Sequence, residues 1–145
     1  MNIKQLSIFL ENKAGRLAHV TGILGDAGVN IRALALADTS DFGILRLIVN
    51  DVDKAQEVLR KHNVVCVAND VTAVEVEDKP GGLAKVLVVL QSAGVNVEYM
   101  YAFTEWKTGR AALIFRFDDP DKAAKRLSEA GISVFAQVDL TGNAK

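Results

Sequence analysis

The sequence has one cysteine and no long apolar run. With Cys66 as its single thiol, the chain cannot form an internal disulfide. No run of apolar residues approaches the roughly 20 that a membrane-spanning helix needs. The start, "MNIKQLSIFLEN", lacks the basic beginning and the longer apolar core of a signal peptide. We therefore expect a cytoplasmic protein in which Cys66 is a small buried hydrophobe; the alternative is a reactive thiol.

The sequence also lacks a concentration of charge. Its 17 basic residues nearly balance 18 acidic ones, and neither sign forms a block. A polyanion or a charged membrane surface is therefore not expected as a partner. Three aromatic residues on one strand suggest an RNA platform, but acidic neighbours accompany them and the basic signature of that platform is missing, so no nucleic acid is expected. These aromatic residues are Tyr99, Tyr101 and Phe103.

Motifs for catalysis and for metal or cofactor binding are scarce. The two histidines, His19 and His62, are far apart in sequence and belong to no metal-binding pattern. No glycine-rich loop ends in Gly-Lys-Ser/Thr, and "GILGDAG" does not have the spacing of a dinucleotide-binding loop. We therefore expect no cofactor, no metal and no enzymatic activity.

What the sequence does contain is an internal repeat at an offset of 66 residues. The segment "ENKAGRLAHVTGILGDAGVNI", which begins at residue 11, aligns with "EDKPGGLAKVLVVLQSAGVNV", which begins at residue 77. The match then slips by two residues, so that "DVDKA" at 51–55 aligns with "DPDKA" at 119–123. A duplication of this length indicates two paired domains more than an open array of short repeats.

Each copy has the pattern of the same strands and helices. Alternation predicts strands, and apolar residues at helical spacing, such as Leu17, Val20 and Leu24, predict a helix after the first strand. We expect Asn12 or Asp78 to cap that helix. We expect Gly28 and Gly94 to end the first helix of each copy, and Asp51 and Asp119 to begin the second helix. The expected strands cover residues 3–11, 30–38, 42–50 and 64–68 in the first copy, and 71–77, 96–103, 109–117 and 132–138 in the second.

The order β-α-β-β-α-β predicts an α+β protein with two ferredoxin-like domains, each an antiparallel sheet with helices on one face. The expected boundaries are 1–69 for the first domain, 70–140 for the second and 141–145 for a tail.

Apolar residues fill both faces of the second strand of each copy. We expect Leu34, Leu36 and Met100 to lie in the helix-covered core. An alanine strip (Ala33, Ala35, Ala37) and the aromatic strip Tyr99, Tyr101 and Phe103 would then lie on the uncovered face, which predicts a homodimer; alternatively the tyrosines are ordinary surface residues.

The loops "NKAGRL" and "DKPGGL" precede the first helix of each copy and are the best candidates for a binding site. Glycine there allows a ligand to approach backbone N–H groups at the positive end of a helix, which suits a carboxylate. Asn30 and Asn96 leave the same helix at its other end, so they would reach such a ligand only from another domain. The alternative is that Gly15 is only a turn and Asn30 only a helix exit.

With the strand and helix order around them, the segments "GRLAHVTGILGDAGVNI" and "GGLAKVLVVLQSAGVNV" resemble the ACT domain, and the whole chain resembles a stand-alone tandem ACT protein. The resemblance implies amino-acid binding at domain interfaces, between the first loop and helix of one unit and the helix exit of another. Asp78 in place of Asn12 would repel a ligand carboxylate, which argues against binding by the second copy. Carried over, the ligand-binding residues are Asn12, Ala14, Gly15, Arg16, Leu17, Gly28, Val29, Asn30 and Ile31, with Gly81, Gly82, Leu83 and Asn96 in the second copy.

The expected function is therefore that of a non-catalytic, allosteric regulator that binds a small amino acid. Arg16 or the backbone near Gly15 would receive the ligand carboxylate, and Asn30 of an adjoining unit would fix its polar head. The partners would be the amino acid, a second copy of the chain and an enzyme of amino-acid metabolism. The alternative is a regulatory or structural subunit that docks on a metabolic enzyme through its sheet face and has no ligand of its own.

Overall fold

A computed structural model describes residues 2–38 and 41–135. The chain divides into two compact units, with the boundary between Asn69 and Asp70. Of the described residues, 4–69 form the first unit, and 70–135 form the second, which also includes residues 2 and 3.

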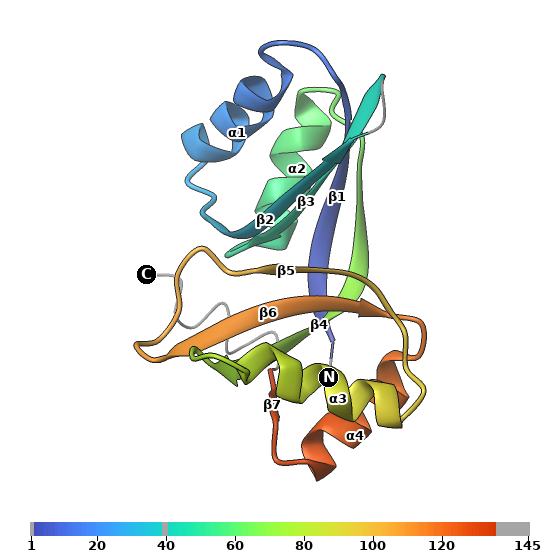
Figure 1. The fold of residues 1–145 in the computed structure, drawn as a ribbon. Coiled ribbons are helices and arrows are strands. Elements are labelled where there is room, and N and C mark those ends of the chain that lie inside the picture. The colour runs from blue at the N-terminus through green and yellow to red at the C-terminus, as the bar shows by residue number, and fades with distance from the viewer. Residues whose placement is uncertain (1, 39–40, 136–145) are drawn as a thin grey trace. The chain divides into compact units, whose positions relative to one another are not determined.

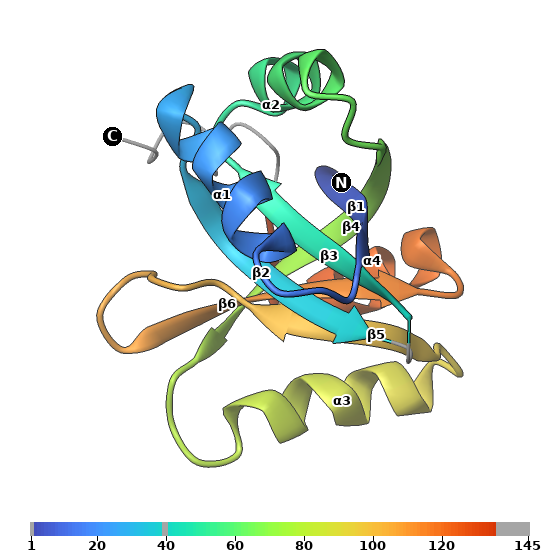
Figure 2. The same cartoon turned by 90° about the horizontal axis from the view of Figure 1, so that it is seen from above.

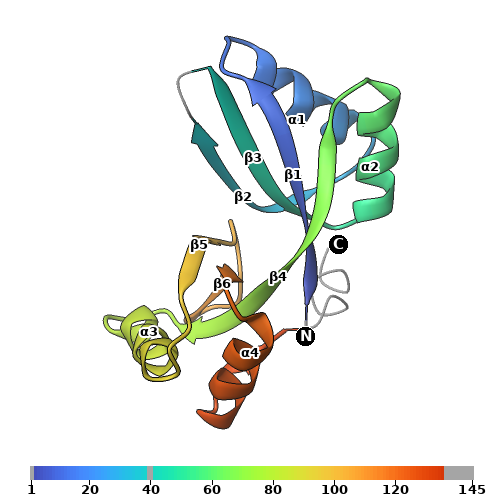
Figure 3. The same cartoon turned by 90° about the vertical axis from the view of Figure 1, so that its right-hand side faces the viewer.

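The first unit is a four-stranded sheet with two helices. Its strand order is β2-β3-β1-β4, and β3 pairs antiparallel with both β1 and β2. Figure 3 shows both helices on the same face of these strands. The elements are β1 (Ile3–Glu11), α1 (Arg16–Asp26), β2 (Ile31–Asp38), β3 (Phe42–Val49), α2 (Val52–Lys61) and β4 (Cys66–Glu77).

The second unit repeats this arrangement, beginning with the second half of β4. The two strands expected at 64–68 and 71–77 are thus one continuous strand, β4, which leads from the first unit into the second. Within the second unit β6 pairs antiparallel with β4 and β5, and β7 pairs antiparallel with β4. The other elements are α3 (Gly82–Ser92), β5 (Val97–Ala102), β6 (Arg110–Phe117), α4 (Pro120–Glu129) and β7 (Ser133–Val134).

The predicted α+β class and the repeated β-α-β-β-α-β order are confirmed, as Figure 1 shows. Residues 136–138 of the last expected strand lie outside the described residues. Each unit has its own apolar core between sheet and helices. In the first unit Leu24 of α1 and Leu59 of α2 meet Leu6 and Leu47 of the sheet, and all four side chains are fully buried. In Figure 2 α1 crosses the strands β2 and β3.

The prediction that Leu34 and Leu36 lie in the core is wrong. They pair with Leu47 and Leu45, so they are on the helix-covered face, but their side chains are 42% and 53% exposed. They lie on β2, which is the edge strand of its unit. Met100, at the matching place in the second unit, does pack against the core.

The aromatic strip lies on the sheet face opposite Met100, as predicted, but it is not the exposed surface that the sequence suggests. Tyr101 is buried, and Phe103 is partly buried. Phe103 contacts Trp106 edge-on at 5.2 Å between ring centroids, and Trp106 contacts Phe135 at 4.9 Å. The connection between β5 and β6 therefore folds back over the end of the strip.

Cys66 is partly buried and packs against the first core, as expected of a small hydrophobe. Burial raises the pKa of its thiol, so that the thiol is less readily ionised than a free cysteine.

The helix ends follow the sequence signals at two of the three kinds of position that were predicted. Gly28 and Gly94 adopt the left-handed conformation after α1 and α3, with φ of 76° and 70°. Asp51 and Asp119 cap α2 and α4, each accepting a hydrogen bond at 3.1 Å from the backbone N–H three residues on. The exception is the start of α1 and α3. Asn12 and Asp78 do not cap these helices, because Gly15 and Gly81 occupy the cap positions and no side chain bonds there.

Removing the cap of α4 should cost stability. We expect Asp119→Ala to lower the free energy of unfolding by about 1 kcal/mol, because the N–H of Lys122 loses its acceptor. Asp51→Ala at the matching position of α2 should cost a similar amount. Urea unfolding followed by circular dichroism measures both. Unchanged stability in both variants would contradict a capping role.

Candidate functional site

Of the four helices in the described part of the chain, two begin without a side-chain cap. Gly15 and Gly81 hold the left-handed conformation at the starts of α1 and α3, with φ of 86° and 84°, and neither first turn carries an acidic residue. By contrast, α2 and α4 have both an aspartate cap and an acidic residue in the first turn. The positive ends of α1 and α3 are therefore the ones left available to an anion from elsewhere.

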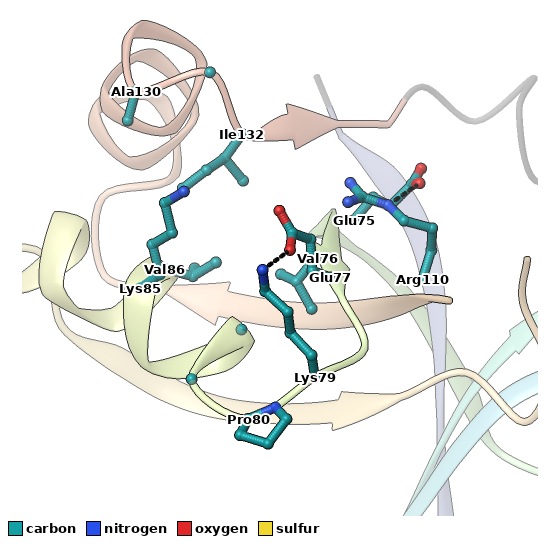
Figure 4. Close-up of a pocket in the computed structure, with 13 residues that line it drawn as sticks. Glu75, Val76, Glu77, Lys79, Pro80, Lys85, Val86, Arg110, Ala130 and Ile132 are labelled. Carbon is teal, nitrogen blue, oxygen red and sulfur yellow. Dashed lines mark hydrogen bonds and ion pairs between the residues drawn. The ribbon is translucent and has the colours of Figure 1, made fainter. Parts of the chain in front are cut away.

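A cavity of about 250 Å³ opens beside the start of α3, within the second unit. Its walls come from the end of β4, the glycine loop, the first turn of α3, the start of β6 and the chain that follows α4 (Figure 4). Apolar side chains form part of this lining: Val76, Pro80, Val86, Ala130 and Ile132.

Five charged side chains also line this cavity, and four of them are paired. The Arg110 Nε donates to Glu75 at 2.8 Å, and Lys79 pairs with Glu77, as Figure 4 shows. The hydrogen bond and charge of Lys79 hold the pKa of Glu77 below its usual value, so Glu77 is ionised at neutral pH. Lys85 has no acidic partner among the described residues. The cavity therefore carries one lysine outside these ion pairs beside an uncapped helix, and the charge of this lysine also helps to lower the pKa of Glu77.

The floor of the loop requires glycine at position 82. A Cβ on Gly82 would lie 2.1 Å from the carbonyl oxygen of Glu77. No side chain fits against that backbone, so the start of α3 presents bare main chain to the cavity. Arg16 stands at the matching place in the first copy, so the two loops differ in shape at this point.

The loop of the first copy borders a much smaller cavity, of about 70 Å³, with room for only a few water molecules. Asn12, Arg16 and Leu17 line it. Glu11 lies 3.4 Å from Arg16 and 3.0 Å from Lys13, and the hydrogen bond from Lys13 is the main reason that the pKa of Glu11 is lowered. A ligand carboxylate at Arg16 would therefore share the guanidinium with Glu11.

The helix exits named as candidate ligand residues lie at the opposite ends of α1 and α3 from these loops. The backbone N–H of Asn30 donates to the Asn50 side chain at 2.9 Å, and that of Asn96 donates to Asp118 at 2.9 Å. Val29 is buried in the core of its unit. Within one unit the structure does not bring Gly28, Val29, Asn30 and Ile31 together with the loop at residues 12–17.

Of the second-copy candidates, Gly81 and Gly82 line the large cavity, whereas Leu83 and Asn96 are not part of its lining. Asp78 also lies outside the lining, between the lining residues Glu77 and Lys79. Lys85 lines the cavity but is not among the residues predicted from the sequence, although it stands in "GGLAK", one turn into the helix, where a cation near the loop is visible. Ala130 and Ile132 were not predicted either, because no local signal for them exists.

The described residues show neither a metal-binding cluster nor a helix that could cross a membrane. Among residues 2–38 and 41–135, no group of three or more His, Cys, Asp or Glu side chains is arranged to hold a metal ion. None of the helices in those ranges has the length and apolar character to cross a membrane.

Comparison with known proteins identifies the family. The family model for an ACT domain pair matches residues 1–143. The chain belongs to the ACT-domain family. A solved protein from Bacteroides thetaiotaomicron shares 42% sequence identity with it, with a TM-score of 0.90 over 97% of this chain and 96% of the other. No curated protein matches the sequence.

More distant ACT proteins share the fold. The ligand-free regulatory subunit of aspartate kinase from Thermus thermophilus has a TM-score of 0.63 at 18% identity, over 88% of this chain and 91% of that one. The regulatory subunit from Thermus flavus has a TM-score of 0.61 at 17% identity, over 90% and 94%. ACT domains are regulatory modules. Membership of this family therefore indicates a regulatory function, of a kind that fits amino-acid sensing.

Proposed function

We propose that this ACT domain pair is a non-catalytic regulatory protein that binds a free amino acid at the uncapped start of a first helix. The observation that carries the proposal is the contrast between helices. The starts of α1 and α3 lack caps and acidic residues, whereas α2 and α4 have both. A cavity lies against each uncapped start.

The chemistry of these helix ends suits the carboxylate of an amino acid. Free N–H groups and the helix dipole stabilise a negative charge there by about 0.3–1 kcal/mol at exposed sites, and more when partly buried. Dissociation constants in the micromolar to millimolar range, typical of metabolite sensing, require only roughly 4–8 kcal/mol in total. A few such contacts and a small apolar surface therefore suffice.

Regulation would follow from a difference in ligand affinity between two arrangements of the protein, since only such a difference shifts an equilibrium. We propose that the regulator acts in the cytoplasm as a homodimer, and that its target is an enzyme of amino-acid metabolism. The two Thermus proteins are regulatory subunits of aspartate kinase, and this supports a target of this kind.

A thermal-shift screen of the full chain against the twenty amino acids tests the proposal. A ligand at about 100 times its Kd stabilises the folded state by about 2.7 kcal/mol, which raises the Tm by several degrees. We expect at least one amino acid to do so at millimolar concentration, and calorimetry to confirm the binding. Flat results for all twenty would overturn ligand binding and favour docking on an enzyme without a ligand. A solution mass of one chain at micromolar concentration would contradict the homodimer.

A further inference from the structure

The first sheet carries three exposed apolar side chains on the face that its helices leave uncovered. Phe9 of β1 is 51% exposed, Val65 just before β4 is 65% exposed, and Val67 within β4 is 51% exposed. The residues between them in sequence, such as Ile8 and Cys66, belong to the core, so alternation directs these three to the opposite face. The backbone N–H of Phe9 donates to the carbonyl oxygen of Val65 at 3.3 Å, which places the two chain segments side by side. We call Phe9, Val65 and Val67 the apolar sheet surface.

Two residues of β3 extend this surface. Ile44 pairs with Phe9 in the sheet register and is partly buried. Phe42 is 60% exposed but pairs with the charged Glu11, so it lies at the rim. Side chains at the rim of an interface contribute little to its free energy, whereas a few side chains at the centre contribute most of it.

The second copy has matching positions, which the repeat identifies. The offset between the copies is 66 residues before the slip of two and 68 after it. The sheet of the second unit pairs Glu75 with Ser133, just as the backbone hydrogen bond joins Phe9 to Val65 in the first. The counterparts of Phe9, Val65 and Val67 are therefore Glu75, Ser133 and Phe135.

In the second copy these positions are polar or covered by the chain itself. Phe135 is buried, and the ring centroid of Trp106 lies 4.9 Å from that of Phe135. Glu75 has a side chain only 13% exposed and pairs with Arg110 at 2.8 Å and with Lys107 at 3.9 Å. Trp106 and Lys107 come from residues 103–109, which connect β5 to β6, whereas only residues 39–41 connect β2 to β3. The first copy thus has no segment of similar length at this place.

We infer that the apolar sheet surface is the contact between two copies of this chain, related by a two-fold axis. This inference rests on the proposed homodimer and specifies its interface. With its rim, the surface exposes apolar area on the order of 300–400 Å², since a whole aromatic side chain offers about 150–250 Å² and each side chain here is half or more exposed. A stable interface covers about 800 Å² on each partner, of which about 60% is apolar. The surface therefore supplies most of the apolar area that a stable dimer needs.

Two properties favour a second copy over a different protein. The three central side chains are uncharged, so the surface can lie against an identical surface without repulsion. Among the described residues, the second copy carries a paired carboxylate and a covered ring at the matching positions, so each chain has one such surface. One self-complementary surface per chain closes a pair with both surfaces buried, whereas two would continue into an open chain of molecules.

A charge at the centre of the surface tests the inference. Val65→Lys would place a lysine of each copy in one apolar contact, where the charges repel each other and lose hydration. We expect it to raise the dissociation constant of the dimer at least tenfold, measured by sedimentation velocity over a range of concentrations. Val65 is mostly exposed and lies outside the regular strand, so the variant should fold like the native chain, which circular dichroism checks.

The second copy supplies the matched control. Ser133 is exposed at the counterpart position, and Ser133→Lys should leave the dissociation constant unchanged. Val65→Ile keeps the apolar character and should also leave the dimer intact, whereas Val67→Lys should weaken it as Val65→Lys does. An equal loss in Ser133→Lys would contradict the inference, because a general effect of added charge would then explain both results.

The outcomes separate this interface from the proposed function. Dimers as stable as the native ones in both Val65→Lys and Val67→Lys would overturn the inference and leave the homodimer intact. The second copy would then meet another surface, such as the exposed Leu83, Leu87 and Val88 of α3. A native chain that sediments as a single chain at micromolar concentration would overturn the homodimer and this interface together, and would favour a different protein as the partner. Amino-acid binding is tested separately by the thermal-shift screen.

Discussion

Gly82→Ala is expected to destabilise the second unit by about 3 kcal/mol, the upper part of the range for overpacking a closely packed site. The added Cβ would lie 2.1 Å from the carbonyl oxygen of Glu77, and that atom belongs to backbone, so either the loop or the end of β4 has to shift. Urea unfolding followed by the fluorescence of Trp106, the single tryptophan, measures the effect on this unit.

Gly22→Ala is the matched control and should have the opposite sign. Gly22 lies inside α1, and a Cβ there would have nothing within 4 Å. Replacing an unconstrained helical glycine by alanine stabilises a helix by roughly 0.5–1 kcal/mol. Circular dichroism during thermal unfolding compares both variants with the native chain. A Gly82→Ala protein as stable as the native one would contradict the requirement for glycine at this position.

Phe115→Ala should destabilise the protein by about 3–5 kcal/mol, the usual cost of removing a buried aromatic ring. Phe115 is fully buried on β6 and stacks on Phe117 with 5.1 Å between ring centroids. The loss includes both the transfer of the ring and the cavity that it leaves. Urea unfolding followed by Trp106 fluorescence measures the free energy, because both residues belong to the second unit.

Phe42→Ala removes the same ring from the surface and serves as the control. Its side chain is 60% exposed, so the change should alter stability by no more than about 0.5 kcal/mol. Equal losses in the two variants would show that burial does not explain the effect of Phe115→Ala.

Most of the fold was predictable because the repeat presents each signal twice. The alternation of β1 and the helical spacing of Leu17, Val20 and Leu24 are local patterns, and the structure places these elements where the patterns do. Caps depend on residues adjacent in sequence, which is why Asp51 and Asp119 were found. The expectation for Asn12 and Asp78 was wrong, because a left-handed glycine takes the cap position instead.

The candidate site was predictable only in part. The glycine loops were found, since an unusual glycine pair before a helix is visible in the sequence. The preference for the first copy rested on Asp78, and nothing in the sequence shows that this side chain lies outside the cavity. The exposed Leu34 and Leu36 illustrate the same limit, because alternation assigns a sheet face without showing how far the helices cover it.

The sequence by itself determined the duplication, the order of strands and helices in each copy and the two glycine loops before the first helices, because these depend on residues close together along the chain. Only the tertiary structure decided which of the two loops borders the larger cavity. That depends on the approach of Gly82 to the backbone of Glu77 and on Ala130 and Ile132, which packing brings opposite Val86. Contacts between residues distant in sequence are set by the packing of whole elements, and no local pattern encodes them.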